Sequence, residues 1–122
     1  MDERKRRGNR GEAAVAAYLR RRRYRLVASQ YRCRFGEIDL IAWSPEGILC
    51  FVEVKTRTEA EFARALEAVT PAKQRRLRAA AQMYLVQTEL DTPCRFDVAE
   101  VYPGPGGEWE RPRIHYMESA FY

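Results

Sequence analysis

Histidine is almost absent from this 122-residue sequence, and cysteine is scarce. The single histidine is His115, and the three cysteines, Cys33, Cys50 and Cys94, show no CxxC spacing. A zinc site of several histidine ligands is therefore excluded, and cysteine–histidine catalysis would require His115 to meet a thiol. We interpret the odd number of cysteines as reduced thiols packed as small hydrophobic residues.

Long hydrophobic runs are also missing. No apolar stretch approaches the ~20 residues needed to cross a bilayer, and Met1–Arg7 lacks the apolar segment of a signal peptide. We therefore expect a cytoplasmic protein without a membrane partner. Hydrophobic residues still make up 46% of the chain, and the length suits one packed domain over residues 1–122.

Lysine is the third scarce residue. The chain carries 22 basic residues and a net charge of +5, yet only Lys5, Lys55 and Lys73 are lysines and the other 19 are arginines. An excess of basic over acidic residues is compatible with a polyanionic binding partner. It is equally compatible with basic side chains on solvent-exposed helix faces. Lysine is a compact charge with movable donors, whereas arginine is a planar fork, so Lys55 and Lys73 become candidate functional residues.

Hydrophobic periodicity and turn residues predict six elements. They are a helix near 10–22 with Asn9 as N-cap, strands near 24–33, 37–43 and 48–56, a helix starting at Thr70-Pro71, and a strand near 95–101. Residues 57–69 fit either a loop or a short helix, and the tail after residue 101 reads as irregular. The order α-β-β-β-α-β predicts an α/β domain with a mixed β-sheet flanked by helices.

The predicted hairpin of residues 37–56 determines a register. Pro45-Glu46-Gly47 suits a three-residue loop, with glycine in the left-handed position. Counting outward from this loop places Asp39 opposite Glu53 and Glu37 opposite Lys55. Strand alternation then places Ile38 on the same apolar face as Leu40, Ala42, Cys50, Val52 and Val54.

Two facing carboxylates at the end of a buried strand pair call for a counter-charge. At a separation of about 5 Å, Asp39 and Glu53 would repel by about 3 kcal/mol at an effective dielectric of about 20. A divalent cation would relieve this repulsion, and the alternative is an ion-pair cluster in which Lys55 and Glu37 neutralise the pair. With Mg²⁺ or Mn²⁺ bound by the acids, Lys55 would position or deprotonate an attacking water.

The motifs around these residues carry a family resemblance. Asp39 followed by Glu53-Val54-Lys55 is similar to the D…(D/E)xK core of the restriction-endonuclease-like nuclease superfamily. The segments 36–42 and 51–57, with matches along nearly the whole chain, resemble the YraN family of bacterial proteins. Two departures are Ser29-Gln30, where the family carries an asparagine before Tyr31, and the lack of a proline before Asp39.

The resemblance implies a restriction-endonuclease-like sheet, a Mg²⁺-dependent nuclease site and kinship with archaeal Holliday-junction resolvases. In those resolvases a glutamate of the first helix joins the metal ligands, which here corresponds to Glu12. The implied metal ligands are thus Asp39, Glu53 and Glu12, and the implied catalytic residues are Asp39, Glu53 and Lys55.

Two of the candidate residues have more than one interpretation. Glu12 faces inward on the first helix, but its spacing from Asn9 also fits a capping box. Lys73 lies on the buried stripe in the first turn of the second helix, where the macrodipole disfavours a cation, so an anionic partner is expected. That partner is either a phosphate or Glu53. Nucleic acid is expected to contact Lys73, Arg75, Arg76 and Arg78.

These observations lead to one main function and two alternatives. The main hypothesis is a Mg²⁺-dependent nuclease acting on DNA, branched or single-stranded, and cutting a two-fold junction would call for a homodimer. The first alternative is a non-catalytic nucleic-acid-binding module with the same fold. The second is a protein-interaction domain whose arginine-rich faces bind acidic partners.

Overall fold

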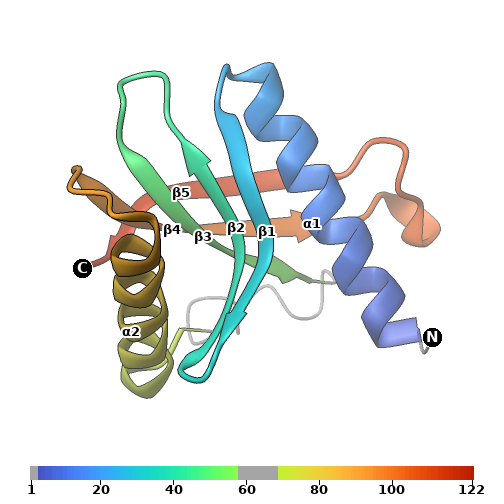
Figure 1. Cartoon of the computed structure of the whole chain (residues 1–122). Coiled ribbons are helices and arrows are strands. Elements are labelled where there is room, and N and C mark those ends of the chain that lie inside the picture. Colours follow the sequence, from blue (N-terminus) through green and yellow to red (C-terminus); the bar gives the residue numbers. More distant parts are fainter. Residues whose placement is uncertain (1–2, 58–68) are drawn as a thin grey trace.

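Five strands form one twisted sheet with a helix on each face (Figure 1). The computed structural model describes residues 3–57 and 69–122. The elements are α1 (Glu3–Arg21), β1 (Arg25–Cys33), β2 (Gly36–Trp43), β3 (Leu49–Thr56), α2 (Pro71–Thr88), β4 (Cys94–Tyr102), the 3-10 turn η2 (Pro105–Gly107) and β5 (Arg113–Phe121). Within the described residues the strand order is β1-β2-β3-β4-β5, in which β3 and β4 pair in parallel and the other neighbours are antiparallel. The predicted α/β class with a mixed sheet is confirmed.

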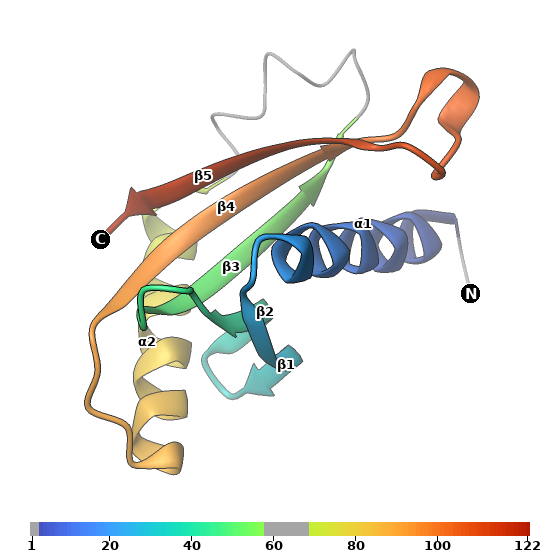
Figure 2. The same ribbon diagram turned by 90° about the horizontal axis from the view of Figure 1, so that it is seen from above.

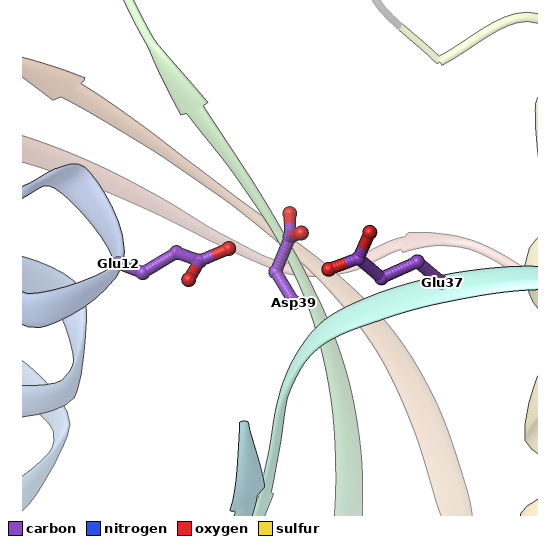
Figure 3. Close-up of side chains that lie close together, drawn as sticks. All are labelled: Glu12, Glu37 and Asp39. Atoms are coloured by element: carbon purple, nitrogen blue, oxygen red, sulfur yellow. The ribbon is translucent and has the colours of Figure 1, made fainter. Parts of the chain in front are cut away.

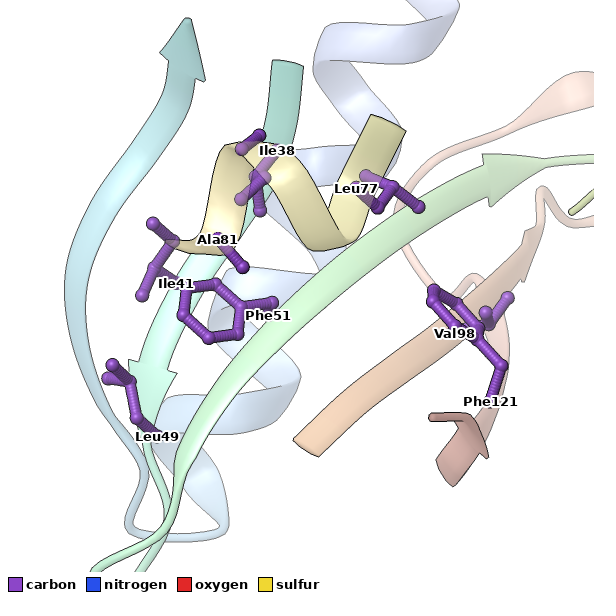
Figure 4. Packing of buried hydrophobic residues seen from close by; sticks show 9 residues of the cluster. Ile38, Ile41, Leu49, Phe51, Leu77, Ala81, Val98 and Phe121 are labelled. Atoms are coloured by element: carbon purple, nitrogen blue, oxygen red, sulfur yellow. The ribbon is translucent and has the colours of Figure 1, made fainter. Parts of the chain in front are cut away.

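Each face of the sheet has its own hydrophobic core. Helix α1 contributes Val15 and Leu19 to a cluster with Leu40, Val52 and other residues of the central strands. Helix α2 contributes its buried residues to the opposite cluster, part of which is drawn in Figure 4. Strands β2 and β3 are therefore covered on both sides, as their two apolar faces predict. Neither helix of the described residues has the length and apolarity to span a membrane.

Helix α1 is longer than the apolar pattern predicts. It begins at Glu3 rather than near residue 10 and ends at Arg21. Its first turns are rich in Arg and Lys, which favour helix but carry no apolar periodicity, so the pattern could not detect them. Asn9 consequently lies inside the helix, and the prediction that it is the N-cap is wrong. The capping-box interpretation of Glu12 is wrong for the same reason.

The hairpin turn between β2 and β3 forms as predicted. Ser44 N donates to the Ile48 carbonyl at 2.8 Å, and Gly47 adopts the left-handed conformation with φ 85°. The strands then pair in the predicted register, with Trp43 opposite Leu49. The turn residues thus determine the register of the strands that carry the candidate site.

Helix α2 starts where the sequence predicts. Thr70 is its N-cap, and the threonine hydroxyl accepts a hydrogen bond from the backbone N–H of Lys73. The apolar face predicted for this helix is confirmed, because Leu77, Ala80 and Ala81 are buried. Residues 58–68, which cover most of the stretch left open between loop and short helix, lie outside the described residues.

The tail is not irregular, because Arg113–Phe121 forms the additional strand β5. Figure 2 shows β3, β4 and β5 side by side, with β5 at the outer edge. The fully buried Asp97 carboxylate accepts hydrogen bonds from Tyr116 Oη at 2.5 Å and Ser119 N at 2.9 Å. Arg95 Nε pairs with the same carboxylate at 3.1 Å. A buried charge on β4 therefore holds β5, a contact between distant residues that no local pattern reveals.

Candidate metal and nuclease site

The two strands that carry the predicted site separate at the point where the acids begin. Backbone pairing of β2 with β3 ends at Leu40–Val52. Beyond this pair, the Val54 backbone N–H donates to a side chain instead of to the backbone of β2. Its acceptor is Asp39 Oδ2, at 2.8 Å. The predicted backbone pairing of Asp39 with Glu53 and of Glu37 with Lys55 is therefore wrong.

The separation also changes the face of Ile38. Alternation predicts that Ile38 shares the face of Leu40, but Ile38 packs in the α2 cluster while Leu40 packs in the α1 cluster. In Figure 4 the Ile38 side chain lies beside helix α2. Regular alternation requires a continuous pleat, and β2 leaves that pleat once its ladder with β3 has ended.

Three carboxylates converge where β2 leaves β3. Glu12 extends from α1, and Glu37 approaches from β2 on the other side of Asp39 (Figure 3). One oxygen of each of the three side chains lies within 4.8 Å of the others. The sequence predicted Glu12 and Asp39 as ligands but left the role of Glu37 open. In the sequence, the spacing of two residues between Glu37 and Asp39 indicates that both side chains can lie on the same side of a strand.

The surroundings of Asp39 disfavour the ionised form of its carboxylate. Burial, the nearby Glu53 charge and the Glu12 carboxylate together raise the pKa of Asp39 to about 8. The hydrogen bond from Val54 N opposes this shift without cancelling it. Without a cation, Asp39 is therefore mostly protonated at neutral pH. A divalent cation would favour the ionised form.

Glu53 is held by two lysines. Its Oε1 lies 3.1 Å from Lys55 Nζ and 2.8 Å from Lys73 Nζ, and the residue is only 7% exposed. Burial lowers the pKa of Lys55, the Glu53 charge opposes this shift, and Lys73 adds to it. For Lys73, burial opposes the charged form, but Glu53 outweighs it and the pKa is raised. Of the two partners predicted for Lys73, Glu53 is the one that it contacts in this structure.

A cavity of about 510 Å³ opens over these residues on the α2 side. Its lining includes Glu37, Asp39, Glu53, Lys73 and Arg76. The cavity therefore exposes both the carboxylates and two cationic side chains to one ligand.

The predicted nucleic-acid contacts on α2 are placed unequally. Arg75, Arg76 and Arg78 are all exposed, and Arg76 lies at the cavity. Arg78 Nη1 donates to the Tyr122 carbonyl at 2.8 Å. Arg75 and Arg76 are thus better placed for an external anion than Arg78.

One residue of the site was not among the predicted site residues, although the sequence marks its position as a departure from the family. Gln30 Nε2 donates to Glu12 Oε2 at 2.9 Å and to Asn9 Oδ1 at 3.3 Å. Gln30 also has a positive φ of 51° within β1, a conformation uncommon for a residue other than glycine. It occupies the position where the motif departs from the expected asparagine, and it links β1 to the carboxylate cluster.

Comparison with known proteins identifies the family. The sequence profile described as "Uncharacterised protein family UPF0102" matches residues 11–101. The chain belongs to the UPF0102 family. A UPF0102 protein of Symbiobacterium thermophilum is 48% identical over 116 residues, which cover 94% of this chain and 95% of the relative. Another, from Thermosynechococcus vestitus, is 43% identical over 117 residues, covering 93% and 92% of the two chains.

The matched range of the UPF0102 profile contains every residue of the candidate site. Glu12 lies near its start, Asp39 and Glu53 in its middle, and Lys73 in its second half. UPF0102 is thus the family, called YraN above, that the hairpin motifs resemble. Its description states no activity, so the function has to be argued from the site.

Proposed function

We propose that this UPF0102 protein is a metal-dependent nuclease that hydrolyses phosphodiester bonds in DNA. The observation that carries the proposal is the convergence of Glu12, Glu37 and Asp39 beside the Glu53–Lys55 pair. Hydrolysis of a phosphodiester needs charge neutralisation at the phosphate and an oriented water. The site offers carboxylates for a cation, with Lys73 and Arg76 at the same cavity and Lys55 paired to Glu53.

The donor set fits a hard divalent cation. Mg²⁺ and Mn²⁺ take oxygen ligands, and three carboxylate oxygens within 4.8 Å of one another supply them from Glu12, Glu37 and Asp39. Glu53, predicted as a ligand from the motif, is adjacent but engaged by the lysines. A bound cation would polarise the phosphate and lower the pKa of a coordinated water.

The protein's own cations supply the remaining roles. Arg76, at the rim of the cavity, would bind a phosphate oxygen of the substrate strand through its planar fork. Lys55 Nζ would orient the attacking water, and its lowered pKa favours the neutral amine that is needed to accept a proton. Lys73 would hold Glu53 in place through their 2.8 Å contact or release it toward the cation.

The resemblance of Asp39 and Glu53-Val54-Lys55 to the restriction-endonuclease-like core supports DNA as the substrate class. Kinship with the resolvases would imply branched DNA and a homodimer, since a two-fold junction presents two equivalent strands. The exposed arginines of α2 would follow the phosphate backbone.

One observation favours a second candidate, a nucleic-acid-binding module without catalysis. Both lysines contact the same oxygen of Glu53, so this carboxylate has cationic partners without any metal. Binding through the arginines would then require no cation.

Cleavage assays distinguish the two functions. Labelled single-stranded, duplex and four-way-junction DNA, with RNA counterparts, would be incubated with Mg²⁺, Mn²⁺ or EDTA. The nuclease proposal expects metal-dependent cleavage that Asp39→Asn abolishes and Glu46→Gln, a change in an exposed acid of the β2–β3 turn, retains. Binding without cleavage under every metal condition would refute the nuclease and establish the module.

A further inference from the structure

A second cavity of about 520 Å³ lies on the α1 side of the carboxylate cluster. It runs between α1 and the edge strand β1 and reaches the cluster at Glu12. It will be called the α1–β1 groove, and its lining is Asn9, Glu12, Ala13, Ala16, Arg20, Leu26, Ala28, Ser29, Gln30 and Leu40. The α2-side cavity contains the other two acids of the cluster, Glu37 and Asp39. The three acids therefore lie where the two cavities approach each other.

The two cavities differ in chemistry. The α2-side cavity carries three acids and two basic side chains, which suits a phosphate with its cation. The α1–β1 groove has one acid, Glu12, one basic residue, Arg20, three alanines and two leucines. Its formal charges cancel, and its alanine walls leave room for a flat ring. Its volume is within the ~300–1,000 Å³ typical of small-molecule sites.

Gln30 connects the groove to the cluster. It lies at the register position opposite Asp39, between the pairs Ser29–Leu40 and Tyr31–Ile38. Its amide donates to Glu12 from within the groove lining, and it does so from a left-handed backbone conformation. Uncommon backbone conformations persist where the surrounding structure enforces them, and they concentrate at functional sites. This residue therefore ties the edge strand of the groove to the Glu12 carboxylate.

We propose that the α1–β1 groove binds the nucleoside adjacent to the phosphodiester that is cut. The proposal rests on the proposed nuclease function, because a phosphodiester held at the acids has a nucleoside on each side. A neutral groove with alanine walls and amide and hydroxyl groups suits a nucleobase, which is recognised by stacking and by hydrogen bonds to its edge. The base would be unstacked from its neighbours, so single-stranded or distorted positions would be preferred.

Nucleoside binding can be measured without metal or catalysis. Amide chemical shifts of the ¹⁵N-labelled protein would be followed by NMR during titration with 2′-deoxyadenosine in EDTA, and 2-deoxyribose would be the control for the sugar. The expected result is a set of shifts around Ala13, Ala16 and Gln30 with deoxyadenosine and none with deoxyribose. Equal shifts with both compounds, no shifts, or shifts confined to other surfaces would overturn the proposal.

A variant whose larger side chain fills the α1–β1 groove, compared with a matched control, tests whether the nucleoside binds there. Ala13 is exposed and lines the groove, so Ala13→Phe should weaken deoxyadenosine binding about tenfold or more without removing core contacts. Ala17→Phe, on the same helix but outside the groove lining, should bind as the wild type does. Ala13→Leu replaces Ala13→Phe if the larger ring prevents folding. Undiminished binding by a folded filling variant would refute the site.

The outcome also separates this proposal from the nuclease proposal. Cleavage of DNA without deoxyadenosine binding would refute the groove alone. Deoxyadenosine binding in the groove, with no cleavage of any nucleic acid, would refute the nuclease and retain a nucleoside site.

Discussion

Asp39→Asn should stabilise the metal-free protein, although it removes a side chain at the centre of the candidate site. The Asp39 pKa of about 8 lies far above its ordinary value of 3.8, so folding at neutral pH takes up a proton that the unfolded chain has released. Asparagine carries no charge, and its side-chain oxygen can still accept the hydrogen bond that Val54 N now donates to Asp39. The substitution should remove the cost of protonation and keep the contact.

The pH dependence of the free energy of unfolding determines the magnitude and the sign of this effect. Between pH 3.8 and about 8 the native state binds more protons at Asp39 than the unfolded state. The free energy of unfolding of the wild type therefore falls as pH rises through this window, by at most ~1.4 kcal/mol per pH unit. Asparagine does not titrate. The advantage of Asp39→Asn should consequently grow by about 3–4 kcal/mol between about pH 5 and about pH 8.

Urea denaturation in EDTA at several pH values measures this difference. Other titrating groups are common to both proteins and cancel in the comparison. Glu46→Gln, in the exposed turn, serves as the matched control and should show no pH-dependent advantage. If Asp39→Asn is less stable than the wild type at every pH, the carboxylate is a structural member of an ion-pair cluster and the reasoning fails.

The same variant tests the cation. Mg²⁺ or Mn²⁺ should raise the melting temperature of the wild type, because a ligand that binds only the native state stabilises it by about 2.7 kcal/mol at a hundred times its Kd. Asp39→Asn should lose most of this gain. An equal metal-induced shift in both proteins would place the cation elsewhere.

Three further predictions address catalysis, binding and the core. Lys55→Arg should retain the fold and the DNA affinity in Ca²⁺ but lose about 10²–10⁴-fold in cleavage rate, because arginine cannot release a proton. If the variant cleaves at the wild-type rate, Lys55 is only a charge contact. Replacing Arg75 and Arg76 together with alanine should lower the slope of log K against log salt by about one to two, whereas an unchanged slope would place the binding face elsewhere. Leu77→Ala, at a buried position of α2, should cost about 2–5 kcal/mol in urea denaturation. Val86→Ala, at a residue 68% exposed, should cost less than about 0.5 kcal/mol, and equal losses would contradict the α2 packing.

The parts of the fold governed by local signals could be predicted from the sequence. The Pro45-Glu46-Gly47 turn determines the β2–β3 register, because a left-handed glycine fixes which residues face each other. Thr70 followed by Pro71 marks the start of α2, because threonine suits the N-cap and proline suits the first helical position.

The detailed arrangement of the acids could not be predicted in the same way. Counting from the turn assumes an unbroken ladder, but the Asp39 carboxylate replaces the backbone at the Val54 N–H. The lysines then gather at Glu53, and Glu37 joins Asp39 and Glu12 instead. These positions depend on helices that pack from distant parts of the sequence, so no window of local sequence contains them.

Strand β5 was missed because its pattern is that of a half-exposed edge strand. Arg113, His115 and Glu118 are exposed, and the buried partner that orders the strand, Asp97, lies on β4. The first turns of α1 escape the pattern for a related reason, because charged residues leave no hydrophobic signature in the sequence.

The position of β5 has a consequence for how the protein avoids aggregation. Without β5, the backbone of β4 would be an open template for another chain, flanked by Val98 and Val101. With β5 in place, the outermost strand on that side bears exposed charged residues, and its pairing with β4 is broken by a register shift between Phe96 and Val98. The opposite edge strand, β1, has its own register shift and the left-handed Gln30. Both rims of the sheet thus discourage the addition of a foreign strand.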